Sequence, residues 1–530
     1  MSLMLFKNPW VVSLATLGTV LVSLWKLWWK PQLERKQPFV NLPMPSQKGH
    51  WFFGHVHFAR ASSLEESYKL LLQNCDERGR IGFYMFSSKV VALTHWSDVR
   101  RVLYAEHKHK VVHALERHLG KFLGPHNIGF LNDRLWKHER VVVLKSLAAS
   151  LPKVKAITKN VISTLGASLR RRIQEEQTNS FIIDVLPLLK MVTLDVFGNV
   201  AFSHSFGCCT TLQESAVAAA FSFLSKDLTR RLMTGPVWPT NYFYSIPTTA
   251  NRQHAKDSNV LRQFLAERIA AKQCQKDMEK DSDLLTSLIH AHQSLTEEQS
   301  QKIPLDELMI DILLSLLFAG FDTTSITLSY VLYVTSAYPD IGRSCREEIT
   351  RVGLDNMEDL VYCRAVMRET LRLYPPPFTT QRFLQKPVIL HDGYEIPANT
   401  LVMCPIWYIQ RCAYNFERPT EFRPDRWVRH EGTTWVPRVP SSETPNDSLP
   451  DIAAGNLDAF FTFSAGARSC PGQSFAWSEA LIVMANLLHH FEFSLLPGYV
   501  MQPDRHGIVQ QPKGGLPFTI NVREEQKQVV

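Results

Sequence analysis

The sequence predicts a mainly helical protein with a small β region, and two observations support this prediction. Most long segments repeat apolar residues three and four positions apart, which predicts helices over Val154–Glu176, Asn259–Lys280 and Ala476–Leu488. A few short runs rich in β-branched and aromatic residues predict strands over Ile81–Phe86, Lys89–Leu93 and Pro387–Leu390. The chain has 530 residues, of which 45% are hydrophobic, and is therefore long enough to bury a large core.

The first segment, residues 1–30, is predicted to be a transmembrane anchor. Trp10 to Trp29 is apolar apart from Lys26, and as a helix it would reach about 30 Å, the thickness of a bilayer core. Basic residues gather after this run rather than before it, so the positive-inside rule places the rest of the chain in the cytosol. A mitochondrial or plastid presequence is the alternative, although such peptides are amphipathic and arginine-rich and this segment is neither.

A proline-containing linker over 31–50 leads to a globular domain over 51–530. The net charge of +8 suits an anionic membrane surface or an acidic protein partner. Its basic residues are dispersed and no recognised binding motif occurs, so nucleic acid is not expected as a partner. The nine cysteines are scattered without a C-x-x-C pair, which argues against zinc ribbons and redox motifs and favours reduced thiols.

One internal segment, Leu305 to Tyr338, is apolar enough to resemble a second membrane span. It contains Asp306, Glu307, Asp311 and Asp322, and charges at such depth are costly in lipid. We therefore expect a long helix through the core of a soluble domain.

Cys470 stands in the most informative surroundings of the chain. Gly466 and Gly472 allow close backbone approach to a flat group, Arg468 can bind an anionic carboxylate, and Phe463 can shield the sulfur from solvent. This is the pattern that a thiolate ligand of haem iron requires. The alternative is a buried structural cysteine beside a turn.

The expected core helix carries Ala319-Gly320-Phe321-Asp322-Thr323-Thr324. Gly320 leaves room for a diatomic ligand, and an acid next to an alcohol, Asp322 and Thr323, can relay protons to it. Alternatively, the hydroxyl of Thr323 simply bonds the carbonyl four residues back, at Ala319.

Glu369 and Arg372 lie three positions apart and therefore on one helical face. Prolines that start at Pro375 end that helix, and Arg426 further along can complete a structural ion cluster with the pair.

Trp136 and Arg140 are one helical turn apart, so an indole N–H and a guanidinium on one face can both bond a carboxylate. A surface patch of a helix is the alternative interpretation of these two residues.

Together and in this order, the motifs resemble the cytochrome P450 family, and the chain is similar to its microsomal, membrane-anchored members. The resemblance implies the P450 fold, haem b as cofactor and Cys470 as axial ligand of its iron. It also implies a set of residues that bond the haem propionates, namely Trp136, Arg140, Arg382 and Arg468. Arg382 depends only on its position after the proline run. The departures are small: Ala467 stands where proline or a basic residue is frequent, and Asp425 and Trp427 replace the more usual Glu and Phe.

The resemblance further implies a monooxygenase in the endoplasmic reticulum membrane, facing the cytosol, that activates O2 and hydroxylates or epoxidises a lipophilic substrate. The chain contains no flavin or nicotinamide fingerprint, so electrons are expected from an NADPH-dependent reductase. A fatty acid, a sterol or another isoprenoid all fit as substrate. Two other functions remain open: a haem-thiolate enzyme that rearranges hydroperoxides, and a non-catalytic haem-binding protein.

Overall fold

The computed structural model describes a mainly helical body with five small sheets, in agreement with the predicted fold class. The described residues are 23, 41–46, 49, 55, 63–85, 88–105, 113–175, 180–234, 244–274, 283–293, 304–432, 434–438, 457–506 and 508–523. Apart from residue 23, the predicted anchor lies outside these ranges, as do most of the predicted linker and the polar segment between Arg438 and Leu457.

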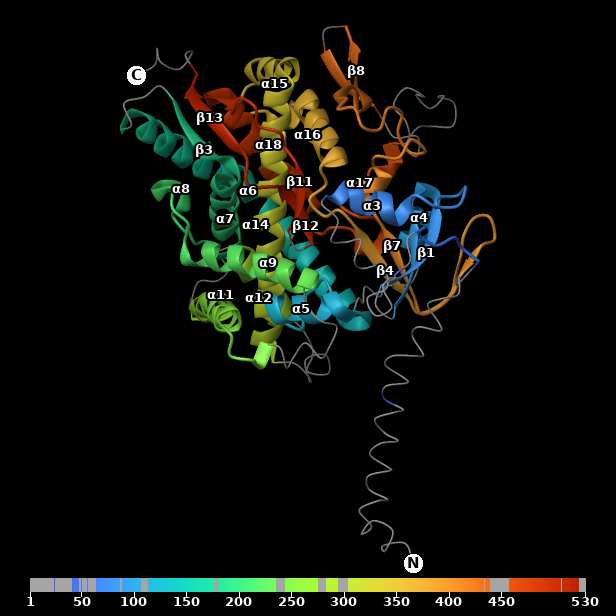
Figure 1. The fold of residues 1–530 in the computed structure, drawn as a ribbon. Coiled ribbons are helices and arrows are strands. Elements are labelled where there is room, and N and C mark those ends of the chain that lie inside the picture. The colour runs from blue at the N-terminus through green and yellow to red at the C-terminus, as the bar shows by residue number, and fades with distance from the viewer. Residues whose placement is uncertain are drawn as a thin grey trace, which may run out of the picture.

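The helices and strands follow one another along the chain as shown in Figure 1. The α-helices are α3 (Leu64–Leu72), α4 (Trp96–Tyr104), α5 (His113–Leu123), α6 (Asp133–Glu175), α7 (Val185–Phe202), α8 (Cys208–Thr211), α9 (Ala216–Thr234), α11 (Thr249–Gln273), α12 (Leu284–Gln293), α14 (Leu305–Ala337), α15 (Pro339–Val352), α16 (Val361–Leu373), α17 (Ile406–Ile409) and α18 (Gln473–His490). Single 3-10 turns are η5 (Met357–Asp359), η6 (Pro424–Arg426), η8 (Leu457–Ala459) and η9 (Gly466–Arg468).

Two of the sheets have more than two strands. One has the order β1-β2-β7-β4, from β1 (Arg80–Met85), β2 (Ser88–Leu93), β7 (Thr400–Cys404) and β4 (Thr380–Leu384). The other has the order β10-β13-β3, from β10 (Phe491–Leu495), β13 (Pro517–Val522) and β3 (Ser180–Asp184). The two sheets lie on opposite sides of α14 in Figure 1.

The remaining strands form two-stranded hairpins. They are β5 (Val388–Ile389) with β6 (Glu395–Ile396), β8 (Val428–Glu431) with β9 (Thr434–Pro437), and β11 (Pro503–His506) with β12 (Val509–Pro512). The strands predicted near residues 81, 89 and 387 are thus confirmed as β1, β2 and β5, although β5 has only two residues.

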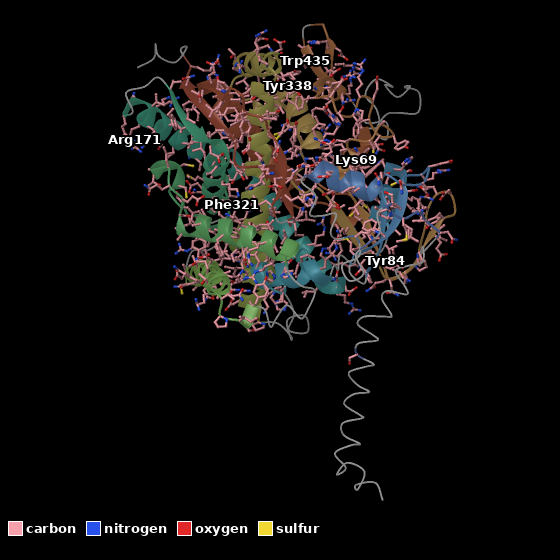
Figure 2. The ribbon with its side chains drawn as sticks, viewed as in Figure 1. Lys69, Tyr84, Arg171, Phe321, Tyr338 and Trp435 are labelled. Carbon is pink, nitrogen blue, oxygen red and sulfur yellow. The ribbon has the colours of Figure 1, made fainter. Side chains whose placement is uncertain are left out.

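Helix α14 crosses the centre of the body, and its 33 residues confirm the expected long core helix. It is apolar and long enough to span a membrane, as is α7, but 78% of its most apolar window is buried within the protein. Figure 2 shows Phe321 in the middle of the body and Tyr338, the residue after α14, near one end. We therefore assign α14 to the protein core.

Most of the serine and threonine hydroxyls of α14 are bonded inside the helix itself. Each of six hydroxyls donates to the carbonyl four residues back, at 2.7–2.9 Å; they belong to Ser315, Thr323, Ser325, Thr327, Ser329 and Thr335. Polar groups buried in an apolar core are costly unless they are bonded, so this pattern lets α14 be both polar in sequence and buried in position.

Helix α6 joins two segments that the sequence predicted separately, the turn around Trp136 and the helix from Val154. It runs without interruption through Pro152, which lacks the N–H that would continue the hydrogen-bond ladder. Val143 and Val154 on either side are fully buried, so tertiary packing holds the helix together across the proline.

Candidate active site

The Cys470 loop closes on itself through backbone hydrogen bonds just before α18. The Cys470 N–H donates to the Phe463 carbonyl at 2.8 Å, and the Ser464 N–H donates to the Phe461 carbonyl at 2.7 Å. Ser464 and Gly466 adopt the left-handed conformation, with φ of 60° and 70°. The loop is therefore a tight turn with a defined backbone path.

Gly466 lies where no side chain fits. A Cβ on this residue would be 2.1 Å from the carbonyl oxygen of Leu103, close to the end of α4. Gly472 is less restricted, since its Cβ would lie 4.0 Å from the sulfur of Cys470, an ordinary contact. The Gly466 backbone therefore comes close to another part of the chain, the Leu103 carbonyl near the end of α4.

The surroundings of Cys470 favour an anionic sulfur. The residue is exposed and precedes the first residue of α18 by three positions, where the helix dipole stabilises negative charge. Arg140 lies beside it, with Nη2 donating to Ser469 Oγ at 3.2 Å. Burial lowers the pKa of the Arg140 guanidinium, and the charge of Cys470 acts in the opposite direction. A thiolate here is well placed as a metal ligand.

Three arginines predicted to bind carboxylates come together on the same side. Burial lowers the pKa of Arg382 to about 10. Burial, followed by repulsion from Arg382 and Arg140, lowers the pKa of Arg468 to about 9. The guanidinium of Arg468 also lies 3.9 Å from the ring centroid of Trp136. These three cations are shielded from water and repel one another. A ligand with more than one negative charge would relieve this repulsion.

The predicted ion cluster around Glu369 is fully buried. Arg372 donates two hydrogen bonds to the Glu369 carboxylate, at 2.7 and 2.9 Å, and the Nε of Arg426 lies 3.2 Å from Oε1. All three side chains have no more than 1% exposure. Arg372 also donates to the carbonyls of Gln410, Pro419 and Glu421, at 2.6–2.9 Å. The cluster therefore fastens the end of α16 to the segment around residues 410–426.

Trp427 belongs to this cluster too, and the sequence noted it only as a replacement for Phe. Its Nε1–H donates to Glu369 Oε2 at 2.9 Å, while the Arg423 backbone N–H donates to Oε1 at 2.9 Å. The substitution itself was the signal, since an indole adds a donor that phenylalanine lacks.

A second buried carboxylate, missed at the level of sequence, precedes Arg140. Glu139 lies 2.9 Å from His292 Nε2 on α12 and 2.9 Å from His138 Nδ1. His292 Nδ1 is 2.8 Å from the Leu288 carbonyl. A carbonyl can only accept, so Nδ1 carries a proton. The pair ties the first turns of α6, which present Trp136 and Arg140, to α12.

Asp322 on α14 is buried in an ion pair with α7. Its Oδ1 lies 2.8 Å from Lys190 Nζ, and Ser225 Oγ on α9 donates to its Oδ2 at 3.1 Å. His506 on β11 lies within electrostatic range of Asp322 and Lys190. The acid of the predicted relay is therefore held by side chains from α7 and α9, with His506 of β11 nearby.

Thr323 shows the hydrogen bond of its alternative interpretation, and Gly320 faces another helix. The Thr323 hydroxyl donates to the Ala319 carbonyl at 2.7 Å, which leaves its oxygen able to accept a hydrogen bond. A Cβ at Gly320 would lie 3.0 Å from the ring of Phe197, so this glycine gives α7 room to approach α14. The open space expected at Gly320 is thus occupied by Phe197.

These features together describe a class of protein: a mainly helical body in which an exposed cysteine loop lies beside a cluster of buried cations. Haem suits both, because its iron takes a thiolate ligand and its two carboxylates suit the cations. The sequence pattern of the cytochrome P450 family matches residues 44–517. The chain belongs to this family, and it is therefore a haem-iron monooxygenase.

The relatives are distant in sequence but cover most of the chain. Human cytochrome P450 4Z1 is 27% identical over 89% of this chain and 89% of its own length. The pig taurochenodeoxycholic 6 alpha-hydroxylase is 24% identical over 89% of this chain and 90% of its own. The chloroplastic carotene epsilon-monooxygenase of Arabidopsis thaliana is 24% identical over 73% and 70%.

Proposed function

We propose that this protein hydroxylates or epoxidises a lipophilic substrate, such as a fatty acid, a sterol or another isoprenoid, with electrons from an NADPH-dependent reductase and with haem b as cofactor. The observation that carries the proposal is the pairing of a thiolate loop at Cys470 with an acid–alcohol pair at Asp322 and Thr323. A haem carrier needs the first feature but not the second. A hydroperoxide-rearranging enzyme needs no source of protons for O2.

On the cysteine side, the protein holds the cofactor and tunes it. Cys470 would ligate the iron, and its anionic sulfur would donate electron density that favours O–O cleavage. Trp136, Arg140, Arg382 and Arg468 would bond the two carboxylates. Phe463 would shield the sulfur from water and oxidants, and the glycines of the loop would let the backbone approach the flat cofactor. When bound, haem supplies the site at which O2 is reduced and one of its oxygen atoms is transferred.

On the α14 side, the protein supplies protons. The Asp322 carboxylate can take a proton from solvent through Ser225 or His506 once its contact with Lys190 loosens. Thr323 can then accept a hydrogen bond at Oγ1 while it donates to Ala319, and it passes a proton on when that donor bond breaks. Both residues work at fixed positions of a buried helix, which keeps the proton path short.

The substrate class is supported by composition and by relatives. The names of two relatives refer to carotene and to a taurochenodeoxycholic compound, and a lipophilic substrate for this chain is in keeping with these names. An apolar N-terminal segment fits an enzyme that meets such substrates at a membrane. We place the protein in the endoplasmic reticulum membrane, anchored by residues 1–30 with the catalytic domain in the cytosol.

Replacing Cys470 with Ala tests the ligand directly. The wild-type protein, reduced and exposed to carbon monoxide, is expected to show the red-shifted Soret band of thiolate-ligated haem. The C470A variant is expected to lose that band, while replacement of the other exposed cysteine, Cys274→Ala, leaves it unchanged. If the band persists in C470A, the assignment of the ligand is wrong.

Spectral titration with a panel of fatty acids, sterols and carotenoids then identifies the substrate through the shift of the iron to high spin. NADPH and O2 consumption with added reductase separates the three functions. A monooxygenase consumes both in proportion to product, a hydroperoxide-rearranging enzyme converts its substrate without either, and a carrier does neither.

A further inference from the structure

Gln410, the residue after α17, has a side-chain amide that is completely bonded and completely buried. Its Nε2 donates to the carbonyls of Leu371 and Arg372 at 3.2 and 3.0 Å. Its Oε1 accepts from the Phe461 N–H at 3.0 Å and from the Thr462 hydroxyl at 3.1 Å. The residue has 0% exposure. One amide thus joins the end of α16 to the chain that enters the Cys470 loop.

The two residues that Gln410 holds stand directly before that loop. The Phe461 carbonyl accepts the Ser464 N–H, and the next carbonyl but one, at Phe463, accepts the Cys470 N–H. Fixing the backbone at 461–462 therefore fixes the Phe461 carbonyl, which accepts the first hydrogen bond of the turn that carries the sulfur. The single proton of the Thr462 hydroxyl is shared between Gln410 Oε1, at 3.1 Å, and the Leu371 carbonyl, at 3.0 Å, which adds a second tie.

The other side of Gln410 is held by the ion cluster. The Arg372 guanidinium donates to the Gln410 backbone carbonyl at 2.7 Å, and the same guanidinium is bound to Glu369. A continuous set of hydrogen bonds therefore runs from Glu369 through Arg372 and Gln410 to Phe461. Each group in this set is buried, so water does not replace a bond that breaks.

Only an amide can make this connection. It offers two N–H donors and a carbonyl oxygen with two acceptor positions, and all four are used here. A glutamate of the same shape lacks both donors and places an oxygen against two carbonyls. A methionine of similar length makes none of the four bonds. A histidine in its neutral form has one donor and one acceptor, and so replaces half of them at most.

We propose that Gln410 is a positioning residue for the axial ligand: it transmits the rigidity of the Glu369–Arg372 cluster to the Cys470 loop and so sets the place of the sulfur. The inference rests on the proposed role of Cys470. It predicts that loss of the amide loosens the loop at Phe461 and weakens thiolate ligation without touching the cofactor itself.

The first measurement follows the Phe461 amide by hydrogen exchange in full-length Gln410→Met and Gln410→Glu variants. In Gln410→Met the Phe461 N–H loses its acceptor, and in Gln410→Glu the repulsion between the new carboxylate oxygen and the two carbonyls displaces the acceptor. Hydrogen exchange at Phe461 is therefore expected to be about tenfold faster than in the wild type. The second measurement follows the absorption spectrum of the reduced carbon-monoxide complex. The fraction of the protein that shows the red-shifted band is expected to be smaller than in the wild type. The band is also expected to disappear several-fold faster over time. Thr462→Val removes one of the four bonds and is expected to give a smaller change of both quantities.

Gln510→Glu is the matched control. Gln510 is also a fully buried amide and its Nε2 donates to the Pro375 carbonyl at 2.6 Å, after the same helix, but it has no bond to residues 461–462. It is expected to lower thermal stability and to leave the band and the Phe461 exchange unchanged. If a general loss of packing caused the effects, Gln510→Glu would change the band and the Phe461 exchange as much as the two Gln410 variants do.

The inference is overturned if Gln410→Met and Gln410→Glu keep the wild-type band and exchange, or if Gln510→Glu changes them as much. Should the Gln410 variants fail to fold, Thr462→Val alone decides through the same two measurements. The proposed function fails by a different result, the persistence of the red-shifted band in C470A.

Discussion

The two sides of the proposed active site hold their polar residues in different ways. On the cysteine side, Glu369, Arg372 and Gln410 bond mostly to one another and to backbone carbonyls and amides, and all are buried. On the α14 side, Asp322 is held by two side chains, Lys190 and Ser225. Backbone partners cannot leave without unfolding a segment, whereas side-chain partners can leave by changing a rotamer.

The difference follows from what each side must do. A metal ligand must stay at one distance through many reaction cycles, so a rigid frame is useful. A proton donor must change partners in each cycle, so a carboxylate held by exchangeable side chains is useful. The comparison predicts that substitutions on the cysteine side lower the stability of the fold or weaken thiolate ligation. Substitutions on the α14 side are predicted to lower the rate of product formation instead.

The largest effect is expected from Glu369→Gln. The change leaves Arg372 and Arg426 buried without their common counter-charge, and breaking such a pair costs about 3–5 kcal/mol. Urea unfolding followed by circular dichroism measures the loss. Glu358→Gln removes an exposed carboxylate that pairs with Lys155 and serves as control, with no resolvable change expected. Wild-type stability in E369Q would mean that the cluster is not the frame of this side.

A somewhat smaller effect, and of another kind, is expected from Asp322→Asn. Loss of a positioned proton donor lowers the rate of product formation by about 100-fold, while the red-shifted band of the carbon-monoxide complex stays in place. Single-turnover kinetics with reductase, together with measurement of released hydrogen peroxide, checks this. Ser329→Ala, on the same helix, is the control. An altered band in D322N would show that α14 also shapes the ligation, against the comparison drawn above.

Gly466→Ala is expected to destabilise the fold by about 1–3 kcal/mol through its positive φ and its contact with the Leu103 carbonyl. Gly393→Ala separates these causes. Gly393 also has a positive φ, of 82°, but a Cβ there would meet no atom within 4 Å. Thermal unfolding of both variants is therefore expected to show the larger loss for G466A. Equal losses would mean that the close approach of α4 matters little.

The smallest effect concerns pH and the pair of Glu139 and His292. Burial raises the pKa of Glu139, but the hydrogen bonds and charges of His292 and His138 outweigh it and the net shift is downward. Burial lowers the pKa of His292, but Glu139 outweighs it and the net shift is upward. The contribution of Glu139 is therefore lost as pH falls through its folded pKa, and that of His292 is lost as pH rises through its own.

The pair is thus expected to stabilise the protein fully between the ordinary pKa values of about 4.5 and 6.5 and less on either side. Melting temperatures from pH 4 to pH 9 are compared between the wild type and a Glu139→Gln, His292→Gln double variant. The difference between the two curves is expected to be largest inside that window. A difference that does not vary with pH would show that the pair is not ionised.

Much of the fold and of the site could be predicted from the sequence, because the relevant signals are local. The Cys470 loop depends on residues within ten positions of one another, and the pair Glu369 and Arg372 depends on one helical turn. Gln410 and His292 could not be found in this way. Their partners lie 38–52 and 153 positions away, and a glutamine or a histidine on its own carries no signal of what it will meet. Lys190 was missed for the same reason, since its partner Asp322 is on another helix.

The self-bonded hydroxyls of α14 have a consequence for how such an enzyme can change over generations. Each of the six serines and threonines described above satisfies its own donor within the helix, so its exchange for alanine or valine leaves no partner elsewhere without a bond. Ser336 differs, since its hydroxyl donates to the Phe493 carbonyl on β10. A self-bonded hydroxyl can equally be gained at a new position without a pre-existing partner. The polarity of the core along α14 can therefore vary by single residue changes while the surrounding architecture stays as it is.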